Sequence, residues 1–124
     1  MPAPRTFSRS ERLKSAKVIA SLFKSGQSLM AYPLRVVWVV HEAAEPEAAR
    51  LAISVSKRLF KTAVQRNRIK RQIREAYRLN KDAFYRKLEE KNVHISLMLI
   101  YIAKEPLPYA EIDAGIKKMI RKFE

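Results

Sequence analysis

The chain has 124 residues, 48% of them hydrophobic, which is enough for one domain with a packed core and too few for two. Lys and Arg number 26 against 12 Asp and Glu, so the formal net charge is +14, and this excess favours a polyanionic partner. The absence of cysteine excludes disulfides, thiolate zinc sites and a cysteine nucleophile. No secretory signal is predicted, and the longest apolar run, residues 97–103, is far shorter than the roughly 20 residues of a membrane span, so we expect a cytoplasmic protein.

The first predicted element is a helix over about residues 15–25. Apolar residues recur there at helical spacing, at Ala16, Ile19, Ala20 and Phe23. Ser15 fits the N-cap of this helix and Gly26 fits its end. Ser8 with Glu11 fits a capping box instead, so the start of the helix stays open.

Three strands are predicted to follow. Pro33 interrupts an extended stretch, after which residues 34–41 are strongly β-forming, with Leu34, Val36, Trp38 and Val40 on one face. An acidic loop containing Glu42, Glu45 and Glu47 turns the chain back. Residues 51–56 alternate large and small side chains, which indicates a half-buried strand.

Two helices and a central strand complete the prediction. A helix covers about residues 63–80, and a strand covers about 93–102 and is stopped by Pro106 and Pro108. The last helix has an apolar stripe made of Ile112, Ile116, Met119, Ile120 and Phe123. We therefore predict an α+β fold, a two-layer sandwich, in a single domain over residues 1–124.

The segment 57–78 carries the strongest functional signal. It holds nine cations and one acid, and thus +8 of the net charge of +14. On a helical wheel its apolar side consists of Ile69, Ile73, Ala76 and Tyr77. Its basic side consists of Asn67, Lys70, Arg71, Arg74 and Arg78, flanked by Arg66 and Arg68. Such a helix packs one side on a sheet and presents the other to a partner.

The residue types on the basic side fit RNA. The planar guanidinium of arginine makes paired hydrogen bonds to phosphate and stacks on bases, and Asn67 adds a donor and an acceptor. A merely solvated helix face usually mixes charges of both signs, which this one does not. The pattern therefore predicts a nucleic-acid-binding surface. A ribosomal or other structural RNA-binding protein remains the alternative, whereas a DNA-binding module is disfavoured because a strand, not a support helix, precedes the basic helix.

Several blocks of the sequence resemble the bacterial ribonuclease P protein subunit. The most specific is Arg66-Asn67-Arg68, followed by Lys70-Arg71 and by residues 74–78, Arg-Glu-Ala-Tyr-Arg. Residues 11–14, 22–26 and 53–58 resemble the first-helix region, its end, and the third strand with the following loop. The resemblance extends over residues 7–104, and the C-terminal helix matches only in pattern.

This resemblance implies an α-β-β-β-α-β-α order with a left-handed βαβ crossover. It also implies a role as the RNA-binding subunit of an endoribonuclease, in which a large catalytic RNA removes the 5′ leader from precursor tRNA. The residues that would contact the catalytic RNA are Arg66, Asn67, Arg68, Lys70, Arg71, Arg74 and Arg78. Those that would form a cleft for the leader are Phe23, Lys57, Arg58, Lys61 and Lys104. Two positions depart from the family pattern, because members often have an aromatic residue in place of Ile19 and a glycine in place of Lys61.

No residue is predicted to be catalytic or to bind a metal. His41 and His94 each lie on a predicted strand with no second histidine at ligand spacing, and no carboxylate pair is placed for acid–base chemistry. We expect no cofactor on the protein itself, and Mg²⁺ in the ribonucleoprotein. Trp38 and Tyr77 are predicted to be core residues, whereas burial and base stacking are equal alternatives for Phe23.

Overall fold

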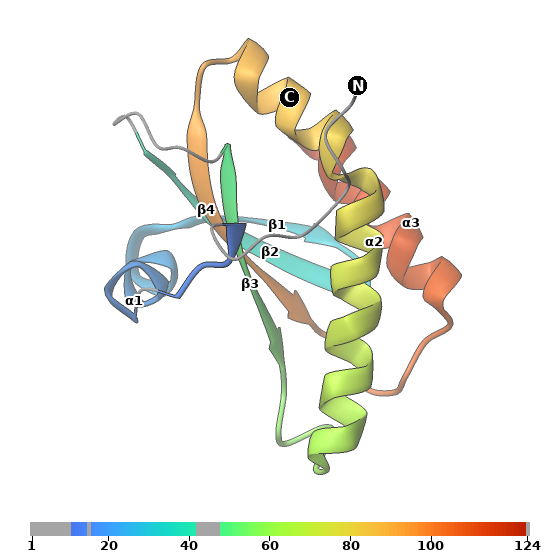
Figure 1. Cartoon of the computed structure of the whole chain (residues 1–124). Coiled ribbons are helices and arrows are strands. Elements are labelled where there is room, and N and C mark those ends of the chain that lie inside the picture. Colours follow the sequence, from blue (N-terminus) through green and yellow to red (C-terminus); the bar gives the residue numbers. More distant parts are fainter. Residues whose placement is uncertain (1–10, 15, 42–47, 124) are drawn as a thin grey trace.

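The computed structural model, which describes residues 11–14, 16–41 and 48–123, contains a four-stranded sheet and three helices (Figure 1). The elements in chain order are α1 (Ala16–Ser25), β1 (Gln27–Ala31), β2 (Leu34–His41), β3 (Ala49–Val55), α2 (Ala63–Glu90), β4 (His94–Tyr101) and α3 (Tyr109–Lys122). The predicted α+β class and element order are confirmed. The predicted roles of Ser8 and Ser15 as caps and the acidic loop 42–47 lie outside the described residues.

The sheet is mixed, with strands in the order β1-β2-β4-β3. β2 is antiparallel to both β1 and β4, whereas β3 runs parallel to β4. Because parallel neighbours need a crossover connection, α2 passes over the sheet between them and forms the βαβ unit that the family resemblance implies. Val55 pairs with Tyr101, so β3 and β4 end at the same edge of the sheet.

Helices cover both faces of the sheet, with α2 and α3 on one face and α1 on the other (Figure 1). The main core lies between the sheet and helices α2 and α3. The residues that α2 contributes to it are Ile69, Ile73, Ala76, Tyr77, Phe84 and Leu88. α3 approaches the turn between β1 and β2 closely at Gly115. A β-carbon there would lie 2.9 Å from Pro33, which explains the glycine.

A smaller core lies beneath α1, where Leu22 packs with Val37 and Met98. This packing extends the predicted pattern of β2, which named apolar residues on one face of the strand only. Val37 is buried on the other face, whereas Val40, near the end of the strand, is 47% exposed. Trp38 is only partly buried and packs against Phe123, with 4.7 Å between ring centroids.

α2 is ten residues longer than predicted and ends at Glu90 instead of Asn80. Asn80 does not terminate the helix, because its amide donates to the carbonyl of Ala76 (2.7 Å) and to Asp113 on α3 (2.8 Å). Lys81, which interrupts the apolar pattern in the sequence, is itself buried.

The segment 11–14 lies between β3 and α2. The backbone N–H of Leu13 donates to the carbonyl of Leu51 (2.8 Å), and Arg12 forms a parallel bridge with the same residue of β3. Glu11 forms a buried ion pair with Lys81 (2.8 Å) and accepts a hydrogen bond from the hydroxyl of Tyr85 (2.5 Å). These contacts fix the segment against α2 before α1 begins.

Candidate RNA interface

The start of α2 is held by the turn that leads out of β3. The hydroxyl of Ser56 accepts hydrogen bonds from the backbone N–H groups of Arg58 (3.1 Å) and Leu59 (3.3 Å). Phe60 is buried against Tyr101, with 5.8 Å between ring centroids. The side chain of Thr62 then accepts from the backbone N–H of Gln65 (3.2 Å) and caps the helix. These contacts therefore fix the position of the first turn of α2.

The outward ridge of α2 carries Asn67 and Arg71, both of which are exposed. They lie on the side opposite Ile69 and Ile73, which are at most 1% exposed and pack on the sheet. A buried apolar stripe thus orients the ridge and leaves its polar groups available to a partner.

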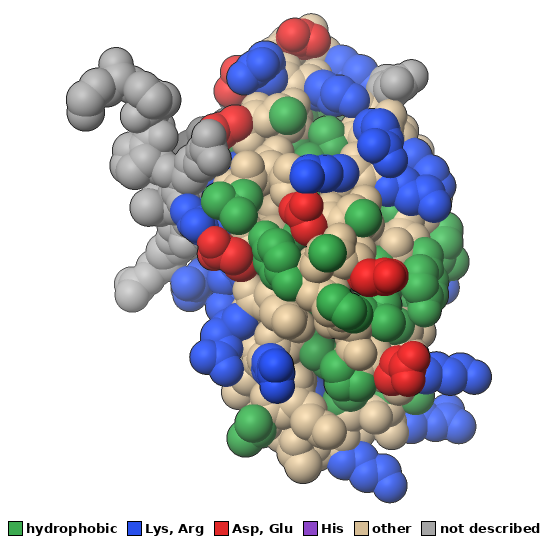
Figure 2. All heavy atoms as spheres, turned by 90° about the vertical axis from the view of Figure 1, so that its right-hand side faces the viewer, with side chains coloured by type: hydrophobic (Ala, Val, Ile, Leu, Met, Phe, Trp, Pro, Cys, Tyr) green, Lys and Arg blue, Asp and Glu red, His purple; other side chains and the backbone are tan. Residues whose placement is uncertain are grey.

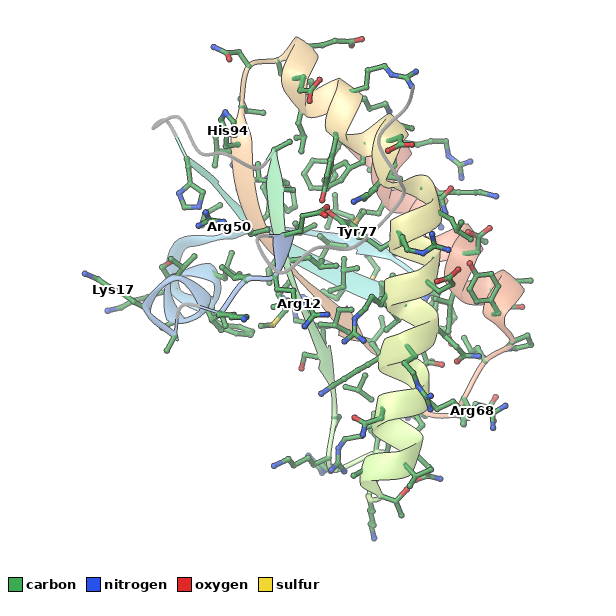
Figure 3. The ribbon with its side chains drawn as sticks, in the orientation of Figure 1. Arg12, Lys17, Arg50, Arg68, Tyr77 and His94 are labelled. Carbon is green, nitrogen blue, oxygen red and sulfur yellow. The ribbon has the colours of Figure 1, made fainter. Side chains whose placement is uncertain are left out.

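Lys70 and Arg74 lie on one flank of the ridge, above a groove formed with segment 11–14 and β3. The groove is lined by Arg12, Leu13, Lys14, Leu51, Ala52, Ile53, Lys70 and Arg74. Figure 3 shows Arg12 between the strands and α2. Four of these eight side chains are cations and none is acidic, so the groove suits a phosphate group. The Nε of Arg74 is buried and has no hydrogen-bond partner among the described residues.

Arg68 lies on the other flank of α2. It faces the connection between β4 and α3 (Figure 3), where it lines a second groove with Gln65, Gln72 and residues 106–109. The predicted RNA-binding residues are therefore spread over the ridge and both flanks of one helix instead of a single flat face.

Two of the predicted contacts are engaged within the protein. The guanidinium of Arg66 donates to the backbone carbonyl of Phe60 (2.8 Å) and ties the preceding turn to the helix. Arg78 pairs with Glu75 (2.6 Å), and this hydrogen bond lowers the pKa of Glu75 and raises that of Arg78. Arg78 therefore adds less positive charge to the surface than its neighbours do.

The residues predicted to form the leader cleft are all exposed. Lys57, Arg58 and Lys61 follow β3, and Lys104 follows β4, so they lie near the edge where these two strands end together. Phe23 projects from α1 and is 63% exposed, so the interpretation of this side chain as a core residue is wrong. A ring that is this exposed is available for stacking.

The face that carries α3 differs in character from the basic helix. Figure 2 shows acidic side chains scattered among Lys and Arg over the upper and middle parts of this face, whereas Lys and Arg alone project from its lower end. Among the described residues no three His, Cys, Asp or Glu side chains are placed to hold a metal ion, and no helix there is long and apolar enough to cross a membrane. The site can bind polyanions through cations, amides and aromatic rings.

A model of the ribonuclease P family matches residues 7–124. The chain belongs to the ribonuclease P protein family. It is 34% identical over 122 residues to the ribonuclease P protein component of Porphyromonas gingivalis strain ATCC 33277, covering 97% of this chain and 89% of the relative. It is 29% identical over 118 residues to that of Clostridioides difficile strain 630, covering 95% and 96%.

Solved structures of ribonuclease P proteins share the fold. The protein from Thermotoga maritima superposes with a TM-score of 0.72 at 23% identity and covers 92% of this chain and 98% of its own. The protein from Staphylococcus aureus superposes with a TM-score of 0.70 at 26% identity and covers 90% and 94%.

As a ribonuclease P protein, the chain is a subunit of the endoribonuclease that matures the 5′ end of tRNA, and it works with the ribonuclease P RNA. Nothing favours the ribosomal alternative. The sequence analysis did not assign Arg12 and Lys14 to the site, although both lie in a block that resembles the family. Only the pairing of this segment with β3 places them beside Lys70 and Arg74.

Proposed function

We propose that α2 binds the catalytic RNA through its ridge and flanks, and that a separate surface binds the 5′ leader of precursor tRNA. The first surface consists of Arg66, Asn67, Arg68, Lys70, Arg71, Arg74 and Arg78. The second consists of Phe23, Lys57, Arg58, Lys61 and Lys104. The exposure of Asn67 and Arg71 directly opposite a buried apolar stripe supports the first assignment most strongly.

The second surface rests on the sheet topology. Because β3 and β4 are parallel neighbours, the cations that follow both strands gather at one edge, where they can meet a single-stranded backbone. Phe23 offers an exposed ring on the opposite side of the sheet from α2, which suits stacking on an unpaired base.

The chemistry of cleavage is assigned to the RNA. Mg²⁺ bound by the RNA would activate water and stabilise the leaving oxygen, whereas this chain binds and orients the two RNA molecules. The side chains on the proposed surfaces are cations, one amide and an aromatic ring, which are poor ligands for Mg²⁺. We further propose a cytoplasmic location and no role in binding DNA.

Two double variants test whether the surfaces are separate. Asn67→Ala with Arg71→Ala should keep the fold and weaken binding to the ribonuclease P RNA by about 1–3 kcal/mol for each lost charge-assisted contact. Lys57→Ala with Lys104→Ala should leave that affinity nearly intact and reduce the preference of the holoenzyme for precursor tRNA over leaderless tRNA. Each variant is measured in both binding assays, and thermal unfolding checks the fold.

The two variants are matched, because each replaces two exposed polar side chains with alanine. If the Lys57 and Lys104 variant loses affinity for the large RNA while leader discrimination survives, the assignment of two surfaces is wrong. If neither variant changes either affinity, this chain binds RNA through other residues.

A further inference from the structure

The groove beside Arg68 adjoins the first surface proposed above and shares only Arg68 with it. It runs between the first turns of α2 and the connection from β4 to α3, and it is lined by Gln65, Arg68, Ile69, Gln72, Pro106, Leu107, Pro108 and Tyr109. Arg68 is its one charged residue. The groove therefore lies beside the basic side of α2 but is lined mainly by amide and apolar side chains.

The wall of the groove opposite α2, formed by residues 106–109, is rigid. The hydroxyl of Tyr101 donates to the carbonyl of Glu105 (2.8 Å) and accepts from the backbone N–H of Leu107 (3.0 Å). Two prolines restrict the backbone on either side of Leu107. The walls are thus held in place without a ligand, which lowers the entropic cost of binding one.

The wall of the groove that α2 forms presents two amide side chains. Gln65 and Gln72 are seven residues apart on one side of α2, and Arg68 lies between them. A glutamine side chain offers a donor and an acceptor together and can pair with the edge of a base, most readily adenine. Arginine between two such amides suits the phosphate or the face of the same nucleotide.

The apolar wall ends at Tyr109, which is partly buried and lines the groove. Its hydroxyl is buried and has no hydrogen-bond partner among the described residues, and burial raises its pKa, so the phenol stays neutral. An unsatisfied buried polar group is uncommon and often marks a place that a ligand or water completes.

We propose that this groove receives one unpaired base of the ribonuclease P RNA. The base edge pairs with the amides of Gln65 and Gln72, the base packs against Leu107 and the proline wall, and its phosphate binds Arg68. The inference rests on the proposed RNA-binding role of α2 and adds base recognition to a surface otherwise suited to phosphates. RNA is favoured over a peptide because the groove adjoins the cationic ridge of α2.

The first test separates base contacts from phosphate contacts by their salt dependence. Gln65→Ala with Gln72→Ala should weaken binding to the ribonuclease P RNA of the same organism by about tenfold, the loss expected for a paired amide–base contact. The slope of affinity against salt concentration should not change, because no charge is removed. Arg71→Ala should reduce that slope, and Gln27→Ala, an exposed amide on β1, should have no effect.

The second test locates the nucleotide. A photo-crosslinking residue replaces Pro106, which is exposed on the rim of the groove, and a control places the same residue at Glu90, exposed at the far end of α2. We expect the Pro106 probe to crosslink to one unpaired nucleotide and the Glu90 probe not to reach it.

The outcomes distinguish this inference from the wider proposal. If Arg71→Ala weakens RNA binding but the glutamine variant binds normally and the Pro106 probe forms no RNA crosslink, the groove does not hold a base, although α2 still binds RNA. Crosslinks scattered over paired nucleotides would also overturn it. If the unaltered chain fails to bind the RNA, the proposed function itself fails.

Discussion

Glu11 and Lys81 are 70 positions apart in the chain, yet their side chains form an ion pair that is almost completely buried. The sequence predicts neither partner, because Glu11 fits a capping box and Lys81 lies just past the predicted end of a helix. Tyr85 donates to Glu11, and Tyr77 donates to Tyr85 (3.1 Å), so the pair is part of a hydrogen-bonded network. Burial raises the pKa of both tyrosines and keeps them neutral.

This network predicts an asymmetric response to substitution. Lys81→Ala leaves the carboxylate of Glu11 buried without its cation, so the free energy of unfolding should fall by about 3–5 kcal/mol. Replacing the pair together, with Glu11→Leu and Lys81→Met, should restore most of that loss, because apolar side chains of similar volume avoid the cost of burying charge. Urea unfolding of the three proteins measures both effects. Equal stability of the single and double variants would contradict this account.

At the level of single elements, the first half of α2 could be predicted from sequence and the second half could not. Between residues 63 and 80 the apolar stripe is regular and the opposite side is cationic, so periodicity alone identifies both the helix and the surface. Beyond Asn80 the stripe continues through Lys81, whose burial depends on a partner from the other end of the chain. A local pattern cannot reveal such a partner.

The contact between α2 and α3 gives a pH-dependent prediction. Asp113 accepts from Asn80 (2.8 Å) and pairs with Lys117 (2.9 Å), and the hydrogen bond from Lys117 is the main cause of its lowered pKa. A carboxyl with a lowered pKa in the folded state stabilises the fold above its ordinary value of 3.8, and this contribution is lost as the pH falls through the folded value. Asp113→Ala should therefore reduce stability by about 1 kcal/mol at neutral pH.

The same variant should differ little from the unaltered protein in strong acid, where Asp113 is protonated in both states. Chemical denaturation at a series of pH values gives the comparison, with Glu90→Ala, an exposed acid at the end of α2, as the control. A difference that stays constant as the pH falls would show that Asp113 acts through packing and not through its charge.

For the molecule as a whole, the charge of +14 predicts a steep salt dependence of RNA binding. If the basic surface neutralises about 6–10 phosphates, affinity for the ribonuclease P RNA should fall by about 10³–10⁵ between about 50 and 200 mM salt. Filter binding or fluorescence titration across this range supplies the slope. A nearly flat dependence would exclude an interface built mainly on these cations.

The element order and the position of the basic helix followed from composition and periodicity, but the arrangement of the sheet did not. The sequence placed Leu34, Val36, Trp38 and Val40 on one face of β2 but did not indicate that α1 covers Val37 on the other face. The grooves on the two flanks of α2 also depend on segments that are remote in sequence, namely residues 12–14 and 106–109. Local patterns therefore predicted the cationic ridge but not the walls beside it.

The pairing of Leu13 and Arg12 with Leu51 also bears on solubility. β3 is an outer strand of the sheet, and an uncovered outer strand is a template on which a second molecule can add its own strand. Segment 11–14 occupies part of that template. A chain that lacks residues 1–14 and carries Lys81→Met, so that no buried charge is left unpaired, should self-associate in sedimentation experiments, whereas the full-length Lys81→Met protein with Glu11→Leu should remain monodisperse. The segment that supplies Arg12 and Lys14 to the groove beside Lys70 and Arg74 would then also keep the protein from aggregating.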